Sequence, residues 1–191
     1  MSIFSSLPTE VVWPATSLHQ ALPLLARMCS LVPSEARNTP DPLPEESATV
    51  ELVGHWLLAA ARQMGLEPLA IETSYPEADE MLSQAGPAFL YLPGEGPAKF
   101  LAIVRGGRRT IQLLGSNGEQ YRLPLSQVRD ALTAKLEEPV LPSIEGMMQH
   151  IGVQNRRRTQ VRRALLCEHL ATARIGGCWM LRLPPGASFR Q

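Results

Sequence analysis

Among the three cysteines and four histidines of this sequence, the candidates for catalytic chemistry are the thiol of Cys29 and the imidazoles of His19 and His55. A cysteine nucleophile needs an adjacent imidazole to take its proton and a third group to orient that imidazole. Cys29 instead falls on the apolar side of a helix predicted over residues 17–31, where a thiol usually packs as a small hydrophobic group. No nucleophile elbow accompanies either histidine. The sequence therefore predicts no catalytic residue, and a residual thiol enzyme using Cys29 is the weakest alternative.

Three other patterns resemble ligand sites but have simpler explanations. Glu77, Asp79 and Glu80 lie within one turn, where the helix dipole alone favours acidic residues. The glycines form neither a Walker sequence nor a dinucleotide-binding fingerprint, and their spacing suits turns. The three cysteines lack the close spacing of a zinc site or a disulfide framework. We expect no metal site and no cofactor in this chain.

The sequence predicts that the helices precede the strands along the chain. The first covers residues 17–31, and the second begins at Thr49, carries Trp56 on its apolar stripe and ends at Gly65. Between them, the proline-rich residues 33–49 favour an extended, mobile loop. Ser74 and Glu77 then form a capping box for a short helix over residues 76–85.

An antiparallel sheet of four to six strands is predicted next. Three β-rich runs cover residues 88–92, 99–105 and 110–114, with a two-residue turn at Gly106–Gly107 between the last two. Asn117–Gly118 indicates another hairpin into residues 119–125, and a final helix begins near Ser126. The fold class is therefore α+β, with helices packed on an antiparallel sheet.

These elements resemble the bacteriocin-processing, papain-like cysteine peptidase domain found at the N-terminus of some ABC exporters. The resemblance covers roughly residues 17–135, and it is carried by the order and spacing of four segments: AARQMGL at 60–66, EMLSQAGPAFL at 80–90, KFLAIV at 99–104, and LGSNG at 114–118 followed by LPLS at 123–126. It implies a papain-like fold and a location on the cytoplasmic side of the inner membrane, as part of an integral membrane protein.

An active member of that family would have a cysteine near the start of the first helix, a histidine opening the second strand and an aspartate after the third. This sequence has Leu18 and His19, then Lys99, then Gly115 and Ser116 at those positions. Peptidase activity is therefore not expected. Degenerate domains of this kind, as the resemblance implies, recognise the exported polypeptide instead of cutting it, or contribute to transporter assembly and regulation. For polypeptide binding, a cleft with Tyr91, Tyr121 and Lys99 is the predicted site. The alternative is a structural module that holds transporter subunits together without binding cargo.

Charge is unevenly distributed along the chain. Residues 155–191 contain eight arginines and one acid, whereas the whole chain has no net charge, so residues 1–154 carry the balancing negative charge. We predict an N-terminal arm at 1–16, a peptidase-like domain at 17–138, a linker at 139–154, and a basic amphipathic elbow at 155–191 that leads to a missing transmembrane region. The elbow would place six residues at an anionic membrane surface: Arg156, Arg157, Arg158, Arg162, Arg163 and Trp179.

The expected partners follow from the same resemblance: a transported peptide or protein, the rest of the transporter, a second copy of the chain and the membrane surface. ATP and magnesium are expected only in a nucleotide-binding domain outside this chain. Nucleic-acid binding is not expected, because the basic segment has few interleaved aromatic residues and no recognised nucleic-acid motif is present.

Overall fold

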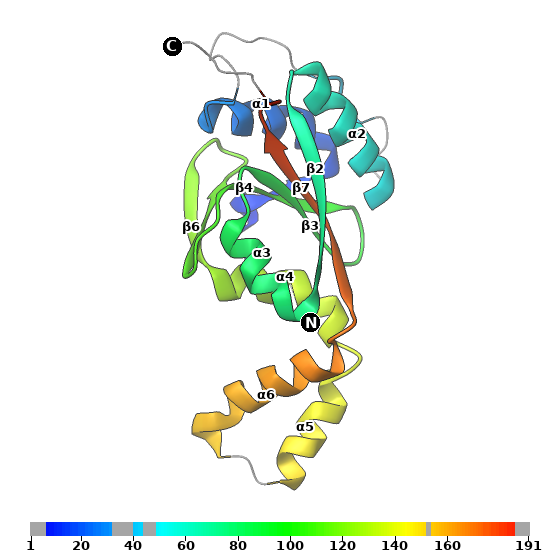
Figure 1. The fold of residues 1–191 in the computed structure, drawn as a ribbon, viewed down its shortest axis with the longest axis vertical. Helices are drawn as coiled ribbons and strands as arrows, with labels where there is room; N and C mark the ends of the chain where they lie inside the picture. Colours follow the sequence, from blue (N-terminus) through cyan, green and yellow to red (C-terminus); the bar gives the residue numbers. More distant parts are fainter. Residues whose placement is uncertain (1–6, 32–39, 44–48, 152–153, 186–191) are drawn as a thin grey trace.

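The computed structural model describes residues 7–31, 40–43, 49–151 and 154–185, and it confirms an α+β fold with an antiparallel sheet. The sheet has seven strands in the order β2-β7-β3-β4-β5-β6, with β1 paired to β4 (Figure 1). Helices cover both faces, so the molecule has two cores. Most of the predicted proline-rich loop at 33–49 lies outside the described residues.

Helices α1 (Leu18–Met28) and α2 (Val50–Gln63) cover one face of the sheet. The Thr49 side chain accepts a hydrogen bond from the Leu52 N–H and so caps α2, and Gly65 follows the helix with a φ of 74°. These two helices and the sheet enclose the α1-side core, whose largest members include Leu22, Leu57, Phe89, Phe100 and Trp179. Gly54 lets α2 lie close to the Trp179 ring, because a Cβ there would be 3.0 Å from that ring.

Helices α3 (Ala78–Gln84) and α4 (Leu125–Glu137) cover the opposite face. They enclose the α3-side core, which contains Leu82, Leu90, Leu101, Val128 and Cys178. Helices α5 (Leu141–His150) and α6 (Asn155–His169) pack on each other at one end of the molecule (Figure 1). None of the described helices combines the length and the apolar content needed to cross a bilayer.

The central strands match the sequence prediction. Strands β3 (Ala88–Leu92), β4 (Lys99–Arg105) and β5 (Thr110–Leu114) have the predicted bounds, and β6 (Gln120–Pro124) differs by one residue at each end. The β4–β5 connection is longer than the predicted two-residue turn, because residues 106–109 all lie between the strands. Gly106 contacts the end of α3, where its N–H donates to the Ala85 carbonyl, and a Cβ would meet the Leu82 carbonyl.

The largest correction concerns the C-terminal segment. Strand β7 (Arg174–Arg182) lies inside the sheet and pairs antiparallel with β2 (Glu67–Ser74) on one side and with β3 on the other. The compact unit therefore does not end near residue 138, and the described part of the predicted elbow, residues 155–185, is not a separate segment. The cause is apolar burial, because Ile175, Cys178 and Leu181 are each at most 5% exposed.

Two other segments also have more structure than predicted. The predicted arm contains β1 (Val12–Pro14), which pairs with the start of β4, and the predicted linker contains α5. Trp13 anchors β1, because it is 1% exposed and its indole N–H donates to the Leu114 carbonyl at 2.8 Å. Strand β2 was not predicted as an element, although Leu69, Ile71 and Thr73 follow the two-residue period of a strand.

Candidate functional site

The three positions where the resemblance would place catalytic residues lie around β1. Lys99 opens β4 and is the pairing partner of Pro14 at the end of β1. Before β1, the Glu10 carbonyl accepts hydrogen bonds from both the N–H and the hydroxyl of Ser116. Leu18 follows β1 after one short 3-10 turn and is fully buried. The fold thus brings these positions together, but their side chains supply neither a thiol nor an imidazole–carboxylate pair.

The histidine at the start of α1 and the thiol at its end have structural roles. The ring of His19 is 2.7 Å from the Thr16 carbonyl through Nδ1, at the first turn of α1. Cys29 lies at the other end of that helix, with its Sγ 3.8 Å from the Val104 carbonyl. Burial raises the pKa of the Cys29 thiol to about 11, so only about one molecule in ten thousand carries a thiolate at pH 7. This environment does not activate a nucleophile.

Tyr91, Tyr121 and Lys99 do not form a common cleft. Tyr91 lies on β3 and packs on the α1-side core, with its ring centroid 5.6 Å from that of Phe100. Tyr121 lies on β6 and packs on the α3-side core, on the opposite face of the sheet. Its hydroxyl accepts a hydrogen bond from Asn117 at 2.8 Å. The predicted binding site is therefore wrong as a single site, because β4 and β5 separate the strands of the two tyrosines.

The predicted membrane-facing residues have three different environments. Trp179 faces the α1-side core on β7 and is 6% exposed, so its predicted contact with a membrane is wrong. Arg158 and Arg162 pair with Glu145 of α5, at 2.6 and 3.5 Å, and Arg163 pairs with Asp79 of α3. Arg156 and Arg157 are exposed. The apolar side of α6 packs on the α3-side core, with Leu166 only 4% exposed.

A polar cluster joins α6 to the body of the molecule. Asp79 on α3 receives Arg163 from α6 and lies 3.7 Å from Nε of Arg129 on α4. Deeper in the same region, the Tyr75 hydroxyl donates to Glu137 at 2.7 Å, and the Thr133 hydroxyl donates to the same carboxylate at 2.6 Å. Burial raises the pKa of Tyr75, and the hydrogen bond to Glu137 raises it further. These contacts hold α3, α4 and α6 together.

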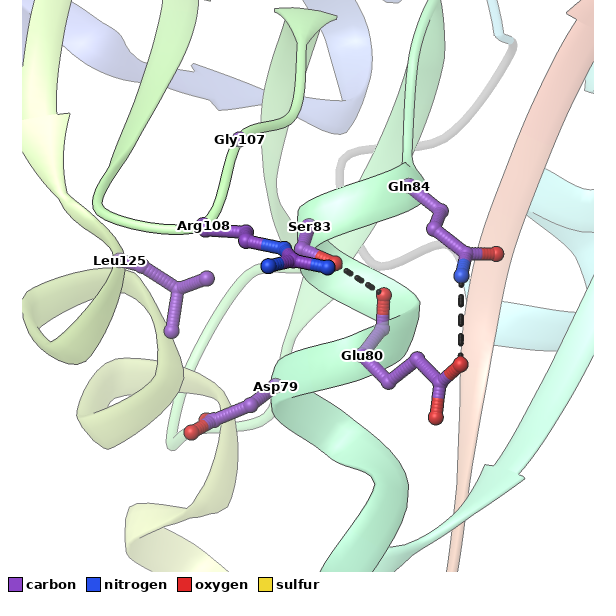
Figure 2. Close-up of a pocket in the computed structure, with 7 residues that line it drawn as sticks. All are labelled: Asp79, Glu80, Ser83, Gln84, Gly107, Arg108 and Leu125. Carbon is purple, nitrogen blue, oxygen red and sulfur yellow. Dashed lines mark hydrogen bonds between the residues drawn. The ribbon is translucent and has the colours of Figure 1, made fainter.

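Hollows lie on both sides of α3. One, of about 620 Å³, is bounded by α3 and by the β4–β5 loop, from which Arg108 extends toward α3 (Figure 2). Its wall includes Glu80, whose carboxylate accepts a hydrogen bond from Gln84 at 3.3 Å and whose carbonyl accepts one from Ser83 (Figure 2). Another hollow, of about 640 Å³, lies between α4 and α6, and its lining residues include Arg129, Glu137 and Arg163 of the polar cluster.

The hollow on the other side of α3 is bounded by the edge of the sheet. It has a volume of about 450 Å³ and an apolar floor of Ile71, Met81 and Met180. Glu72, Glu77 and Glu80 lie around it, with Arg182 at one end. The Ser74 hydroxyl donates to Glu77 at 2.7 Å, and hydrogen bonds from Ser74 keep the pKa of Glu77 below its ordinary value. Among the described residues, this acidic hollow combines three features: the sheet surface, the glutamates around it and the open edge of β2.

The sequence reasoning missed this acidic hollow because it identified neither β2 nor β7. The available signal was the alternation of Leu69, Ile71 and Thr73, and the second strand was obscured by the adjacent arginines and by Gly176–Gly177. Among the described residues, no group of three or more His, Cys, Asp and Glu side chains could hold a metal ion. Neither a known protein family nor a curated protein matches this chain, so its function must be inferred from its residues and their geometry.

Proposed function

We propose that this chain is a non-catalytic, papain-like domain of an ABC exporter that binds the exported polypeptide on the cytoplasmic side of the membrane. The observation that carries the proposal is the identity of the residues at the three positions around β1. Leu18 is buried there, Lys99 opens β4, and Ser116 is bound to the Glu10 carbonyl. A thiolate cannot form at Leu18, and the Lys99 side chain does not supply the imidazole that a cysteine nucleophile needs.

The papain-like part of the proposal is supported by the sequence resemblance and by the order of the elements. Two helices precede the central strands, and the segments that carry the resemblance form α2, the α3–β3 passage, β4 and the end of β5. A domain that has lost its nucleophile can still bind a polypeptide, because recognition needs only surfaces and hydrogen-bonding groups. The hollows beside α3 offer such surfaces.

A second candidate function, transporter assembly, is favoured by the tip of the α5–α6 pair. Met147 and Ile151 lie one helical turn apart and are 39% and 65% exposed. Arg156 and Arg157 follow on the next helix and are also exposed. Apolar and basic side chains together suit a contact with another subunit or with the membrane surface. ATP and magnesium would act only in a nucleotide-binding domain outside this chain.

A peptide library tests the proposal directly. The immobilised chain is panned against random dodecapeptides, enriched sequences are synthesised, and their dissociation constants are measured by fluorescence anisotropy. Each bound peptide is then incubated with the chain for one day and weighed by mass spectrometry. We expect peptides that bind the folded chain but not the heat-unfolded chain, and that remain intact.

Two outcomes would contradict the proposal. Cleavage of the bound peptides at a rate above that in buffer would show that the domain is catalytic. Failure to enrich any peptide over the heat-unfolded control would refute polypeptide binding and favour the assembly function.

A further inference from the structure

The outer side of β2 is an open sheet edge. Among the described residues, β2 pairs with β7 alone and is the first strand in the sheet order. Its neighbour Leu181 donates its N–H to the Pro87 carbonyl, on the β3 side. Because a residue in an antiparallel ladder directs both of its backbone groups to one side, Leu181 does not bond to its β2 partner, Pro68. The backbone of Pro68 therefore faces outward, where its missing N–H costs no ladder bond.

The same alternation identifies the other outward-facing residues. Ala70, Glu72 and Ser74 follow Pro68 at intervals of two, so their backbone groups face the open side as well. The irregularity in the β2–β7 register does not disturb this order, because the extra residue is on β7, between Ile175 and Cys178. At the far end, the Glu77 carboxylate accepts the Ser74 backbone N–H. Pro68 itself is buried, so the accessible backbone groups on the open side are those of the exposed residues Ala70 and Glu72.

The α3-facing side of this edge is apolar. Leu69 is 43% exposed, which makes it one of the large hydrophobic side chains with substantial exposure in the described part of the chain, and it lies opposite Met180 in the ladder. Ile71 and Met81 continue this floor into the acidic hollow of about 450 Å³. Flexible methionine side chains adapt to different apolar partners. A strand added beside β2 would place every second side chain on this floor.

Charge around the edge is negative. Four acids, Glu67, Glu72, Glu77 and Glu80, lie on β2 or next to the hollow, whereas the basic residues there are Arg174 and Arg182. Arg174 pairs with Glu72 at 3.1 Å, and Arg182 is the ladder partner of Glu67. Four acids against two bases leave a net charge of −2, which favours a basic partner.

We propose that the open side of β2 binds an extended basic polypeptide segment as an added strand, with alternate apolar side chains on the floor formed by Leu69, Ile71, Met81 and Met180. This assignment rests on the proposed function, since it locates the polypeptide-binding site of the domain. Backbone hydrogen bonds supply the affinity of an added strand, and the apolar floor and the surrounding acidic side chains select its sequence. A second copy of the chain fits less well, because it would bring two acidic edges together.

The test uses a fluorescein-labelled heptapeptide in which lysines alternate with valines, and two N-methylated versions of it. Methylating the valine nitrogens blocks one edge of the peptide, and methylating the inner lysine nitrogens blocks the other. With the valine side chains on the apolar floor, each strand direction allows only one of the two peptide edges to face β2. We therefore expect one version to bind at least about tenfold more weakly and the other to bind like the parent peptide. The affected version identifies the strand direction: lysine for antiparallel, valine for parallel.

Variants of the chain test the same edge from the other side. Ala70→Pro removes an outward-facing N–H and leaves the β7 ladder intact, so we expect about tenfold weaker binding with little change in thermal stability. Glu80→Lys should weaken binding about threefold to tenfold at low salt, whereas Glu51→Lys, on the exposed first turn of α2, should not. A heptapeptide with glutamates in place of lysines should not bind.

The outcomes separate this inference from the proposed function. Equal binding of both methylated peptides, or equal effects of Glu80→Lys and Glu51→Lys, would overturn the β2 site. Library peptides that bind the chain but are insensitive to Ala70→Pro would also overturn it, while leaving polypeptide binding intact. A concentration-dependent dimer in sedimentation that Ala70→Pro abolishes, without heptapeptide binding, would show that the occupant is a second copy.

Discussion

Gly177 on β7 is a position where one added methyl group should have a large effect. Its φ of 78° lies in the left-handed region, and a Cβ there would be 2.9 Å from the Tyr91 Cβ. We expect Gly177→Ala to lower the free energy of unfolding by about 1–3 kcal/mol, because backbone strain and a side-chain clash add together. Guanidinium denaturation followed by tryptophan fluorescence would measure this loss.

The neighbouring Gly176 is a matched control for that experiment. A Cβ at Gly176 meets nothing within 4 Å, and its φ is not in the left-handed region. Gly176→Ala should therefore change the free energy of unfolding by no more than about 0.5 kcal/mol. Equal losses in the two variants would show that the Gly177 conformation is not what limits this strand.

At the residue scale, the sequence predicted whether a side chain is buried better than it predicted which residues lie beside it. It predicted correctly that Cys29 packs on the protein, because an apolar helical stripe determines burial without any knowledge of the tertiary fold. It could not predict that Tyr91 and Tyr121 lie on opposite faces. That outcome depends on the pairing register of four strands, and a shift of one residue would reverse the face of every side chain.

The α5–α6 pair should respond to pH through Glu145. The hydrogen bond from Arg158 lowers the pKa of this carboxyl below its ordinary value of 4.5. A depressed pKa stabilises the folded state above the unfolded-state pKa, and this contribution is lost as the pH falls through the lower, folded value. The wild-type chain should therefore melt at a higher temperature than Glu145→Gln at pH 7, and the difference should disappear at pH values below the folded pKa.

Thermal melts of both chains between pH 3 and 7 would measure that difference. Glu95→Gln, on the exposed loop between β3 and β4, provides the control and should melt like the wild type throughout. Because the pair is at the surface, about 0.5 M salt should also reduce the difference at pH 7. A constant difference between wild type and Glu145→Gln at all pH values would contradict the ion-pair explanation.

At the element scale, the strands predicted correctly from the sequence are those with a high local density of apolar and β-branched residues. The β4 sequence KFLAIVR is strongly β-forming by itself, and its bounds were predicted without error. Strand β7 contains Gly176 and Gly177 and follows an arginine-rich helix, so its local signal resembled a basic surface segment. Its partners β2 and β3 stabilise it as a strand, and they lie about 100 residues earlier in the sequence.

For the whole molecule, the position of β7 predicts that the segment containing α6 and β7, residues 155–182, is essential for folding. A chain of residues 1–154 would lack the strand between β2 and β3, and would leave the apolar surface against Cys178, Trp179 and Leu181 open to water. We expect this chain to lose cooperative unfolding and to give a poorly dispersed amide NMR spectrum. A chain that ends at Pro185 keeps β7 and should unfold cooperatively.

A well-dispersed spectrum for residues 1–154 would contradict this prediction. It would mean that β2 and β3 can pair directly, or that β2 is not needed for the central strands to fold. Either result would restore the boundary near residue 138 that the sequence alone predicted.

The insertion of β7 also has a consequence for biosynthesis. On the ribosome, residues 67–125 emerge well before residues 174–182, so the β3–β6 meander can form while β2 still lacks its partner. Until β7 emerges, the nascent chain therefore exposes the edges of β2 and β3 that pair with β7 in the folded sheet, and the apolar surface beneath them. Such edges favour aggregation and chaperone binding. Strand β7, which emerges after all the other described strands, thus closes the middle of the sheet, and the yield of folded protein depends on how well the growing chain is protected until then.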